Sequence, residues 1–326
     1  MSYRLPALLA SVLLALTFAQ PVAAQTFPTP GKPVTIIVGF APGGGHDVMG
    51  RALAQELTKQ LGTSVIVENR PGAGGGVSVT VVARADPDGH TLLFNSLSEL
   101  AFRQAVTKVP YDLERDVVPV SLVGVTPIAL VVHESVPAKT MAEFAKYAKS
   151  TPDGVIYGSP GVGTLQHFGG EVLRHKLGLP MKHLAFRGGA PLSNDLAGGH
   201  VVAGMVGLPP LVPLIQSGKV RLIATSSSER SKLTPDTPSY AEVGIGGVDI
   251  ANYVGLAAPK GTPGAILKKL EQASLAAAKS PEMAAIFKRS FSAVIGTTKA
   301  EYEAFIAKER KNQSELIRAM NFKIAG

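Results

Sequence analysis

Glycine-rich turns are the residues of this chain with the clearest chemical potential. The first, Ala41-Pro42-Gly43-Gly44-Gly45, follows a β-branched strand pattern at residues 34–38 and precedes a helical pattern. Glycine lets a backbone approach a ligand closely, because it has no Cβ. The first N–H groups of a helix lack intrahelical partners and lie at the positive end of its dipole. The turn therefore predicts a site for a carboxylate or phosphate.

The same device recurs along the chain. Pro71-Gly72-Ala73-Gly74-Gly75-Gly76 and Ser159-Pro160-Gly161-Val162-Gly163-Thr164 are two further turns, and Arg187-Gly188-Gly189-Ala190-Pro191 is a fourth. Several such turns indicate an anion held largely by backbone groups. Arg187 is the predicted charged anchor, because its planar guanidinium can bind a carboxylate at two points.

Established nucleotide and nucleophile motifs do not fit these turns. Val77 stands where the dinucleotide fingerprint starting at Gly72 requires its third glycine, and no Gly-Lys-Ser/Thr follows any of the turns. Tyr157 occupies the position at which a nucleophile elbow around Ser159 needs glycine. We therefore interpret Ser159 as a turn hydroxyl or as a donor to a bound carboxylate.

Other polar residues allow two readings each. His167, Glu171 and His175 share one helix face, but their spacing differs from the helical zinc motif, so we predict no metal and a His167 that contacts the turn. Asp47 either starts a helix, where the dipole favours it, or orients the turn. Tyr253 either covers a cleft or fills a core. No cofactor is predicted.

Strand-like and helix-like segments alternate, which favours an α/β fold. A stripe of Met49, Leu53, Leu57 and Leu61 predicts a helix that Gly62 ends. Further helix starts are indicated by two capping boxes and two proline signals: Thr140-Met141-Ala142-Glu143, Thr298-Lys299-Ala300-Glu301, Thr262-Pro263 and Ser280-Pro281.

Two extended runs suggest that the chain crosses twice between lobes. Residues 120–132 form a long apolar run interrupted by Gly124 and Pro127, and residues 253–258 form the second run. We therefore expect one lobe from residues 25–126 plus 253–326 and another from residues 127–252. Each should be a mixed, mostly parallel sheet flanked by helices, with a cleft that closes at the hinge.

The N-terminus predicts export. Arg4 precedes a short apolar run, and Val22-Ala23-Ala24 supplies small residues for cleavage, so residues 1–24 read as a signal peptide. The chain has no cysteine and a net charge of +8, with scattered basic residues. These features predict a periplasmic monomer that binds no nucleic acid and attracts anions mildly.

Taken together, the motifs resemble the tripartite tricarboxylate transporter receptors, the Bug family of periplasmic solute-binding proteins. The resemblance covers the whole mature chain. Its motifs are Lys32-Pro33-Val34-Thr35-Ile36-Ile37-Val38, Ala41-Pro42-Gly43-Gly44 with Asp47, Glu68-Asn69-Arg70-Pro71-Gly72-Ala73-Gly74-Gly75, Pro87-Asp88-Gly89, Pro110-Tyr111-Asp112, Pro119-Val120-Ser121-Leu122, Tyr157-Gly158-Ser159-Pro160-Gly161-Val162-Gly163-Thr164 with His167, and Arg187-Gly188-Gly189-Ala190-Pro191.

The resemblance implies a fold of the type II periplasmic-binding-protein kind, whose two lobes close on a small carboxylate. One carboxylate of the ligand would be held by the turns at residues 41–44 and 159–164, partly through water. The expected ligand-binding residues are Phe40, Ala41, Pro42, Gly43, Gly44, Asp47, Gly74, Gly75, Ser159, Gly161, Val162, Gly163, Thr164, His167, Arg187, Gly188, Gly207 and Tyr253.

This chain departs from the family pattern at positions that bear on specificity. Val202 and Gly207 stand where members commonly carry acidic residues, and Tyr253 replaces a common tryptophan. Phe186-Arg187 replaces Tyr-Lys. Loss of the acidic groups makes a ligand with an amine less suitable and favours an apolar or aromatic mono- or dicarboxylate.

The sequence thus predicts a receptor, not an enzyme, that captures a small organic acid and presents it to a membrane permease. Two rival functions remain open. One is a ligand-sensing input protein for a membrane receptor kinase. The other is a hydrolase or isomerase using Ser159, His167 and Asp47, although their sequence spacing supports no nucleophile–base pair.

Overall fold

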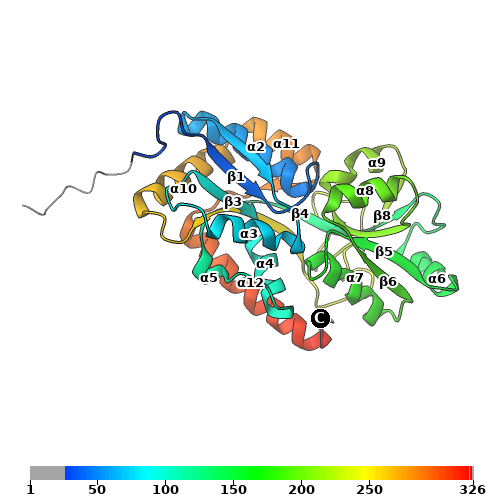
Figure 1. The fold of residues 1–326 in the computed structure, drawn as a ribbon. Helices are drawn as coiled ribbons and strands as arrows, with labels where there is room; N and C mark the ends of the chain where they lie inside the picture. The colour runs from blue at the N-terminus through cyan, green and yellow to red at the C-terminus, as the bar shows by residue number, and fades with distance from the viewer. Residues whose placement is uncertain (1–25, 323, 325–326) are drawn as a thin grey trace, which may run out of the picture.

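The computed structural model describes residues 26–322 and 324 of the chain. It consists of two α/β lobes joined by long strands (Figure 1). The predicted signal peptide, residues 1–24, lies outside the described residues. Within the described part, no helix is both long enough and apolar enough to cross a bilayer.

The first lobe is built on a mixed sheet. Its parallel strands are β1 (Val34–Val38), β2 (Val65–Asn69) and β3 (Thr91–Asn95), in the order β2-β1-β3. Antiparallel strands continue this sheet: β9 (Ala251–Pro259), the first part of β4 (Val117–His133) and β10 (Ala293–Val294). Its helical segments are α2 (Gly45–Leu61), η1 (Ala73–Gly75), α3 (Gly76–Ala83), α4 (Leu97–Val106), α5 (Leu113–Asp116), α10 (Gly264–Ala278), α11 (Pro281–Arg289) and α12 (Lys299–Met320).

The second lobe repeats the plan on a smaller scale. Strand β5 (Val155–Ser159) pairs in parallel with β6 (Met181–Ala185) and β7 (Ala203–Gly207). The end of β4 pairs antiparallel with β7 and with β8 (Val220–Thr225). Its helical segments are α6 (Met141–Ser150), α7 (Leu165–Lys176), α8 (Gly189–Ala197), η2 (Pro209–Leu211) and α9 (Val212–Gln216).

Both sheets are mixed: β1 pairs in parallel with β2 and β3, and β5 pairs in parallel with β6 and β7. The share of antiparallel pairing is larger than the sequence indicated. The reason is that the long strands β4 and β9 run in opposite directions between the lobes and pair with each other from Val117↔Pro259 to Pro127↔Ala251. Alternating strands and helices predict parallel βαβ units well but say little about such return strands.

The two crossing segments are tied together where they leave the first sheet. Strand β4 pairs with β9 as far as Pro127 and with β7 from Ile128 onward. The Ser226 backbone then donates to Ile128 O at 2.9 Å and accepts from Ile250 N at 2.8 Å. The two crossing segments are therefore hydrogen-bonded to the same residue, Ser226, at the point where they pass between the lobes.

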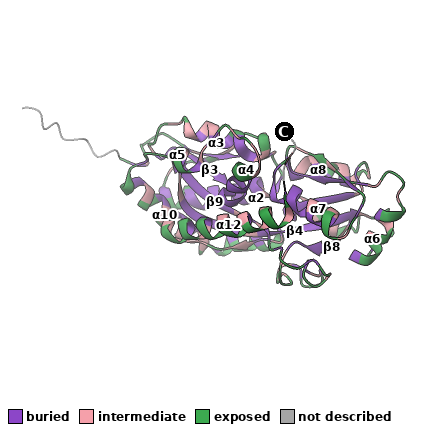
Figure 2. Cartoon of the chain, turned by 90° about the horizontal axis from the view of Figure 1, so that it is seen from below, coloured by how far each residue is buried: buried purple, intermediate pink, exposed green. Residues whose placement is uncertain are grey.

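Each sheet is buried between two helical layers (Figure 2). Helices α2, α10 and α11 cover one face of the first sheet, and α3, α4, α5 and α12 cover the other. The predicted α2 stripe is confirmed: Met49, Leu53 and Leu57 are fully buried, and Gly62 ends the helix with φ +67°. In the second lobe, α6 and α7 cover one face and α8 and η2 the other.

The expected helix starts are confirmed with one exception. Both capping boxes form, at Thr140 and at Thr298, and Ser280 caps α11 by accepting from Met283 N. Thr262 was expected to cap α10 and does not. Its hydroxyl donates to Pro259 O at 2.8 Å, and the helix starts one residue beyond Pro263. Pro263 therefore occupies the N-cap position, and it has no side-chain acceptor for the first N–H groups of α10.

The C-terminal segment is a third connection between the lobes. Helix α12 packs on the first sheet through Tyr302 and Ile306. Beyond its end, Phe322 joins the core of the second lobe, with ring centroids 5.1 Å from Phe168 on α7 and 6.1 Å from Phe102 on α4. Helix α12 and the residues that follow it therefore contact both lobes.

Replacing Phe322 with alanine should destabilise the protein by about 3 kcal/mol, because it removes a largely buried ring shared by both lobes. Urea unfolding measures the change. Leu184→Ala is the control, since Leu184 is 42 % exposed and its loss should cost less than about 0.5 kcal/mol. Equal losses in both variants would contradict a bridging role for Phe322.

Candidate functional site

The conformation of the turn between β1 and α2 is fixed by its own backbone and by Asp47. Gly43 has φ +79°, a conformation that glycine adopts without steric cost. Its N–H donates to Asp47 Oδ2 at 2.9 Å. Asn69, at the end of β2, donates to both Phe40 O at 3.0 Å and Asp47 Oδ1 at 2.9 Å. The ends of two adjacent strands thereby fix the start of α2.

Asp47 is ionised in spite of its burial. Burial acts to raise the pKa of Asp47, but hydrogen bonds from Arg51, Gly43 and Asn69 outweigh it and hold the pKa below its usual value. The side chain is 4 % exposed and all its contacts are internal. The geometry therefore favours the reading in which Asp47 orients the turn.

The second-lobe turn is organised by three buried side chains. Thr164 caps α7 by accepting from His167 N at 3.1 Å, and His167 Nδ1 accepts from Gly163 N at 3.2 Å. The Ser159 hydroxyl lies 3.1 Å from Gly161 O and 2.7 Å from His183 Nε2. Ser159 is fully buried and is therefore a turn hydroxyl.

His183 and His167 are stacked, with centroids 3.8 Å apart. Burial and then the neighbouring His167 lower the pKa of His183 to about 4, and burial also lowers the pKa of His167. Both imidazoles are therefore neutral at neutral pH. The pair supports the turn without adding charge.

Turns of opposite lobes touch each other through backbone atoms. Ala41 N donates to Arg187 O at 3.3 Å. A Cβ built on Gly161 would lie 3.4 Å from Gly74 Cα, and one built on Gly188 would lie 3.1 Å from Ala41 N. Larger side chains at these positions would hold the lobes apart, so the glycines serve lobe contact as well as ligand approach.

Three helix starts meet at a small cavity between the lobes, which we call the interlobe cavity. Helix α2 contributes Gly45 and His46, α7 contributes Gln166, and α8 contributes Gly189. Neither α2 nor α8 has a side-chain cap. The cavity measures about 20 Å³, and its other lining residues are Phe40, Gly44, Met49, Thr126, Pro160, Val206, Gly207, Pro210 and Asn252.

No ionised side chain is among the described residues that line this cavity. Its titratable member, His46, is 5 % exposed, and burial lowers the pKa of His46 to about 3. Within this lining, the groups that favour an anion are therefore helix dipoles and backbone N–H groups.

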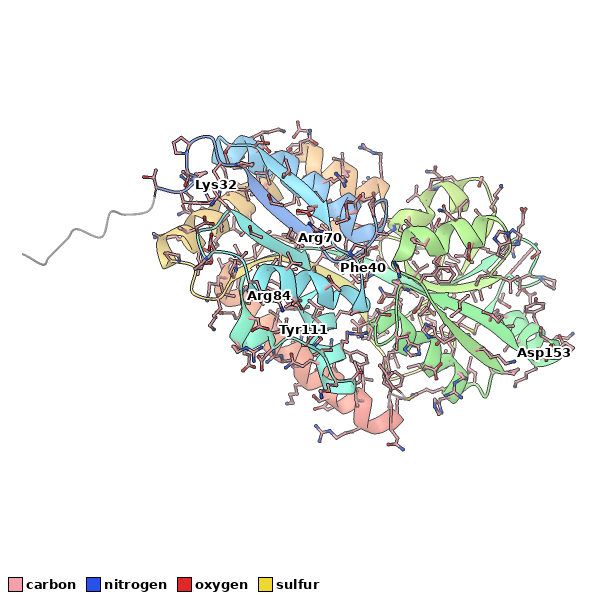
Figure 3. The ribbon with its side chains drawn as sticks, in the orientation of Figure 1. Lys32, Phe40, Arg70, Arg84, Tyr111 and Asp153 are labelled. Carbon is pink, nitrogen blue, oxygen red and sulfur yellow. The ribbon has the colours of Figure 1, made fainter. Side chains whose placement is uncertain are left out.

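A second, larger space of about 250 Å³ carries charge, and we call it the arginine cavity. It is lined by Arg103 of α4, by Arg187, and by the turn at residues 72–75. The Arg103 guanidinium also donates to Val162 O across the lobe interface. Phe40 and Pro160 line both cavities and separate them. Figure 3 shows Phe40 at the junction of the lobes.

The structure divides the predicted site residues into groups. The interlobe cavity receives Phe40, Gly44 and Gly207, and the arginine cavity receives Phe40, Gly74, Gly75, Gly161, Val162 and Arg187. The turns and their supports are built by Ala41, Gly43, Asp47, Ser159, Gly163, Thr164, His167 and Gly188.

Two predicted residues lie apart from both cavities. Pro42 is exposed at the tip of its turn. Tyr253 packs on Phe305 of α12, with centroids 4.7 Å apart, within the hydrophobic cluster of the first lobe. For Tyr253, the geometry favours the core reading.

Sequence reasoning missed several residues of the site. His46 and Gln166 each sit one residue into a helix that follows a glycine turn, which was the available signal. Asn252 lies on a hinge segment and reaches the site through Gln166 Nε2, which donates to its Oδ1 at 2.7 Å. Arg103 and His183 come from distant segments, so their presence depends on the tertiary structure.

A family model described as "Tripartite tricarboxylate transporter family receptor" matches residues 49–322. The chain belongs to this receptor family. Its relatives include Protein BugT of Bordetella pertussis, which is 32 % identical over 98 % of both chains.

Solved structures support the membership and the fold. The receptor resembles the periplasmic binding protein BugD at TM-score 0.85 and 30 % identity, covering 90 % of this chain and 99 % of that one. It resembles MatC of Rhodopseudomonas palustris, solved with bound malate, at TM-score 0.82 and 29 % identity over 89 % and 100 % of the chains. A second R. palustris protein, solved with adipate, gives 0.84 and 26 % over 90 % and 98 %.

The family and the geometry both argue for binding and against catalysis. Asp47 is tied to Arg51 and Asn69 in the first lobe, and the histidine beside Ser159 is His183, not the His167 of the hydrolase hypothesis. Because its relatives are receptors, the chain is a receptor and not an enzyme. On the helix face of His167, Glu171 and His175, the Glu171 carboxylate is also engaged by the protein itself, because it accepts from Tyr157 and Arg174.

Asp47→Asn should lower the free energy of unfolding by about 2 kcal/mol, because an amide nitrogen replaces one of two oxygens that accept charged or backbone donors. Chemical denaturation measures the loss. Asp195→Asn is the matched control, since its carboxylate is 39 % exposed, and it should change stability by less than about 0.5 kcal/mol. A stable Asp47→Asn protein would contradict the anchoring role.

His46 should make the receptor sensitive to acid. Its folded pKa of about 3 lies below the ordinary 6.5, so the unfolded chain binds more protons between these values and stability falls as pH falls. His46 contributes about 1.4 kcal/mol per pH unit in that window. Between pH 6 and 4, the free energy of unfolding of His46→Phe should therefore fall less steeply with pH than that of the native protein, by this amount. For each protein, the free energy is expressed relative to its own value at pH 7.5. An unchanged slope would refute the assignment.

Proposed function

We propose that this protein is a periplasmic solute-binding receptor that captures a small organic carboxylate between its lobes. It would deliver this ligand to the membrane permease of a tripartite tricarboxylate transporter. The observation that carries the proposal is the meeting of three helix starts, from both lobes, at one cavity without an acidic side chain among its described lining residues.

Physical chemistry favours an anion at this point. Each helix N-terminus stabilises a nearby negative charge by about 0.3–1 kcal/mol, and by up to about 2 kcal/mol when partly buried. Helices α2 and α8 lack side-chain caps, so their first N–H groups remain available as donors. A carboxylate would pair with these donors from both lobes at once and would thereby join the lobes.

Ligand entry requires the lobes to separate. The interlobe cavity of about 20 Å³ accommodates roughly one water molecule, whereas a dicarboxylic acid is several times larger. The two hinge segments at Thr126–Ile128 and Ile250–Asn252 are the places where the backbone can absorb that motion.

The proposed ligand class follows from charge and from the relatives. The neighbouring structures hold malate and adipate, both dicarboxylates. Gly207, one of the two positions at which this chain lacks the acidic residue common in the family, lines the cavity, so an ammonium group would find no counter-ion among the described lining residues. Arg187, from the arginine cavity, is the proposed charged partner for a second carboxylate.

Residues 1–24 are proposed to direct export to the periplasm and to be removed there. We further propose that the receptor acts as a monomer, since one chain contains both lobes and the whole cavity. The sensory alternative would use the same cavity with a different membrane partner.

A thermal-shift panel of mono-, di- and tricarboxylates should reveal stabilising ligands. A ligand at 100 times its Kd should add about 2.7 kcal/mol of stability. Native mass spectrometry of freshly purified protein would identify acids that co-purify. No response to any carboxylate would refute the proposed function.

Gly207→Ala should weaken binding of any acid found in the panel by tenfold or more with little change in fold stability. A Cβ on Gly207 would lie 2.6 Å from Asn252 Nδ2, at the wall of the interlobe cavity. Titration calorimetry gives the affinity. Gly264→Ala is the matched control, because nothing lies within 4 Å of a Cβ there. Equal affinities in both variants would contradict the placement of the ligand.

A further inference from the structure

Two buried side chains from opposite lobes line the same cavity, and each has a polar atom without a hydrogen-bond partner. His46, on α2, is 5 % exposed, and its Nε2 has no hydrogen-bond partner. Gln166, on α7, is 2 % exposed, and its Oε1 likewise has none. Both residues line the interlobe cavity. Buried polar atoms are ordinarily satisfied, so this pair calls for a partner that belongs in the cavity.

The chemistry of the two atoms is defined by their surroundings. Gln166 Nε2 already donates to Asn252 Oδ1 at 2.7 Å, which leaves the Gln166 oxygen as an acceptor in need of a donor. His46 stacks on Phe40 with centroids 4.4 Å apart, and its imidazole is neutral. A neutral imidazole nitrogen either donates or accepts, depending on its tautomer.

A hydroxyl group satisfies both atoms. It donates to Gln166 Oε1 and accepts from His46 Nε2–H, and it carries no charge that must be desolvated. A carboxylate oxygen only accepts, so it would leave Gln166 Oε1 unpaired and would repel it. An ammonium group would face the positive ends of three helices without a carboxylate in the described lining of the cavity.

The size of the cavity agrees with this chemistry. About 20 Å³ is room for a single oxygen-sized group.

We propose that His46 and Gln166 together recognise a hydroxyl group, which makes this receptor selective for hydroxylated carboxylates over their unsubstituted analogues. This inference rests on the proposed function and names the ligand class for the same cavity. The two side chains determine specificity, while the helix starts bind the carboxylate.

The experiment is titration calorimetry with matched pairs of acids that differ by one hydroxyl. Suitable probes are succinate against malate, glutarate against 2-hydroxyglutarate, and butyrate against 2-, 3- and 4-hydroxybutyrate. In the native protein, the hydroxylated member of the best-bound pair should bind roughly tenfold tighter or more, because its analogue leaves two buried polar atoms unpaired.

Two variants test the assignment independently. Gln166→Met and His46→Phe keep side-chain volume and remove the polar atom, so each should reduce the preference to within about twofold. The loss of affinity should be larger for the hydroxylated acid than for its unsubstituted analogue in each variant. Gln216→Met is the matched control, since Gln216 is exposed at the end of α9, and it should retain the full preference. Circular dichroism and thermal unfolding establish that each variant is folded.

The outcomes separate this inference from the proposed function. If acids bind but both members of every pair bind equally to the native protein, the cavity holds a resident water and the inference is overturned while the function stands. If the preference survives in both variants, other residues read the hydroxyl and the inference is overturned. If no acid binds, the proposed function and the inference fail together.

Discussion

The structure depends on the opposition of two uncapped helix N-termini across the lobe interface. Helices α2 and α8 both begin after a glycine, and a Cβ placed on Gly44 would lie 3.8 Å from Gly189 N. Like ends of two dipoles are thus brought together with no acidic side chain among the described residues that line the space between them. Two hydrogen bonds between the lobes, from Ala41 N to Arg187 O and from Arg103 to Val162 O, oppose this repulsion. An anion would turn a repulsive junction into an attractive one.

Support for that junction is spread over both lobes and is mostly uncharged. Asp47, Asn69 and Gly43 fix the first turn, while Thr164, His167 and Ser159 fix the second. The neutral histidines His46, His167 and His183 fill space and offer hydrogen bonds without offsetting the helix dipoles. An acidic side chain in place of one of these histidines would compete with the carboxylate of the ligand. A basic side chain there would be a fixed partner for the ligand and would restrict which acid fits.

Local sequence signals predicted the parts of the fold that local physics controls. The stripe on α2, both capping boxes and the glycine turns could be read from the sequence because periodicity, caps and turns depend on neighbouring residues. The Thr262 cap was wrong because helix α10 begins one residue later than expected, with Pro263 at the N-cap position. The extent of antiparallel pairing, the bridge formed by Phe322, and the meeting of Arg103, His183 and Asn252 with the turns depend on segments far apart in the chain. No local pattern encodes them.

The segment after α12 has a mechanical consequence. A third connection between the lobes, besides the two crossing segments, restricts how they can move relative to each other. Phe322 packs against Phe102 of the first lobe and Phe168 of the second, so any separation of the lobes at this edge of the interface would expose its ring to water, at a cost in free energy.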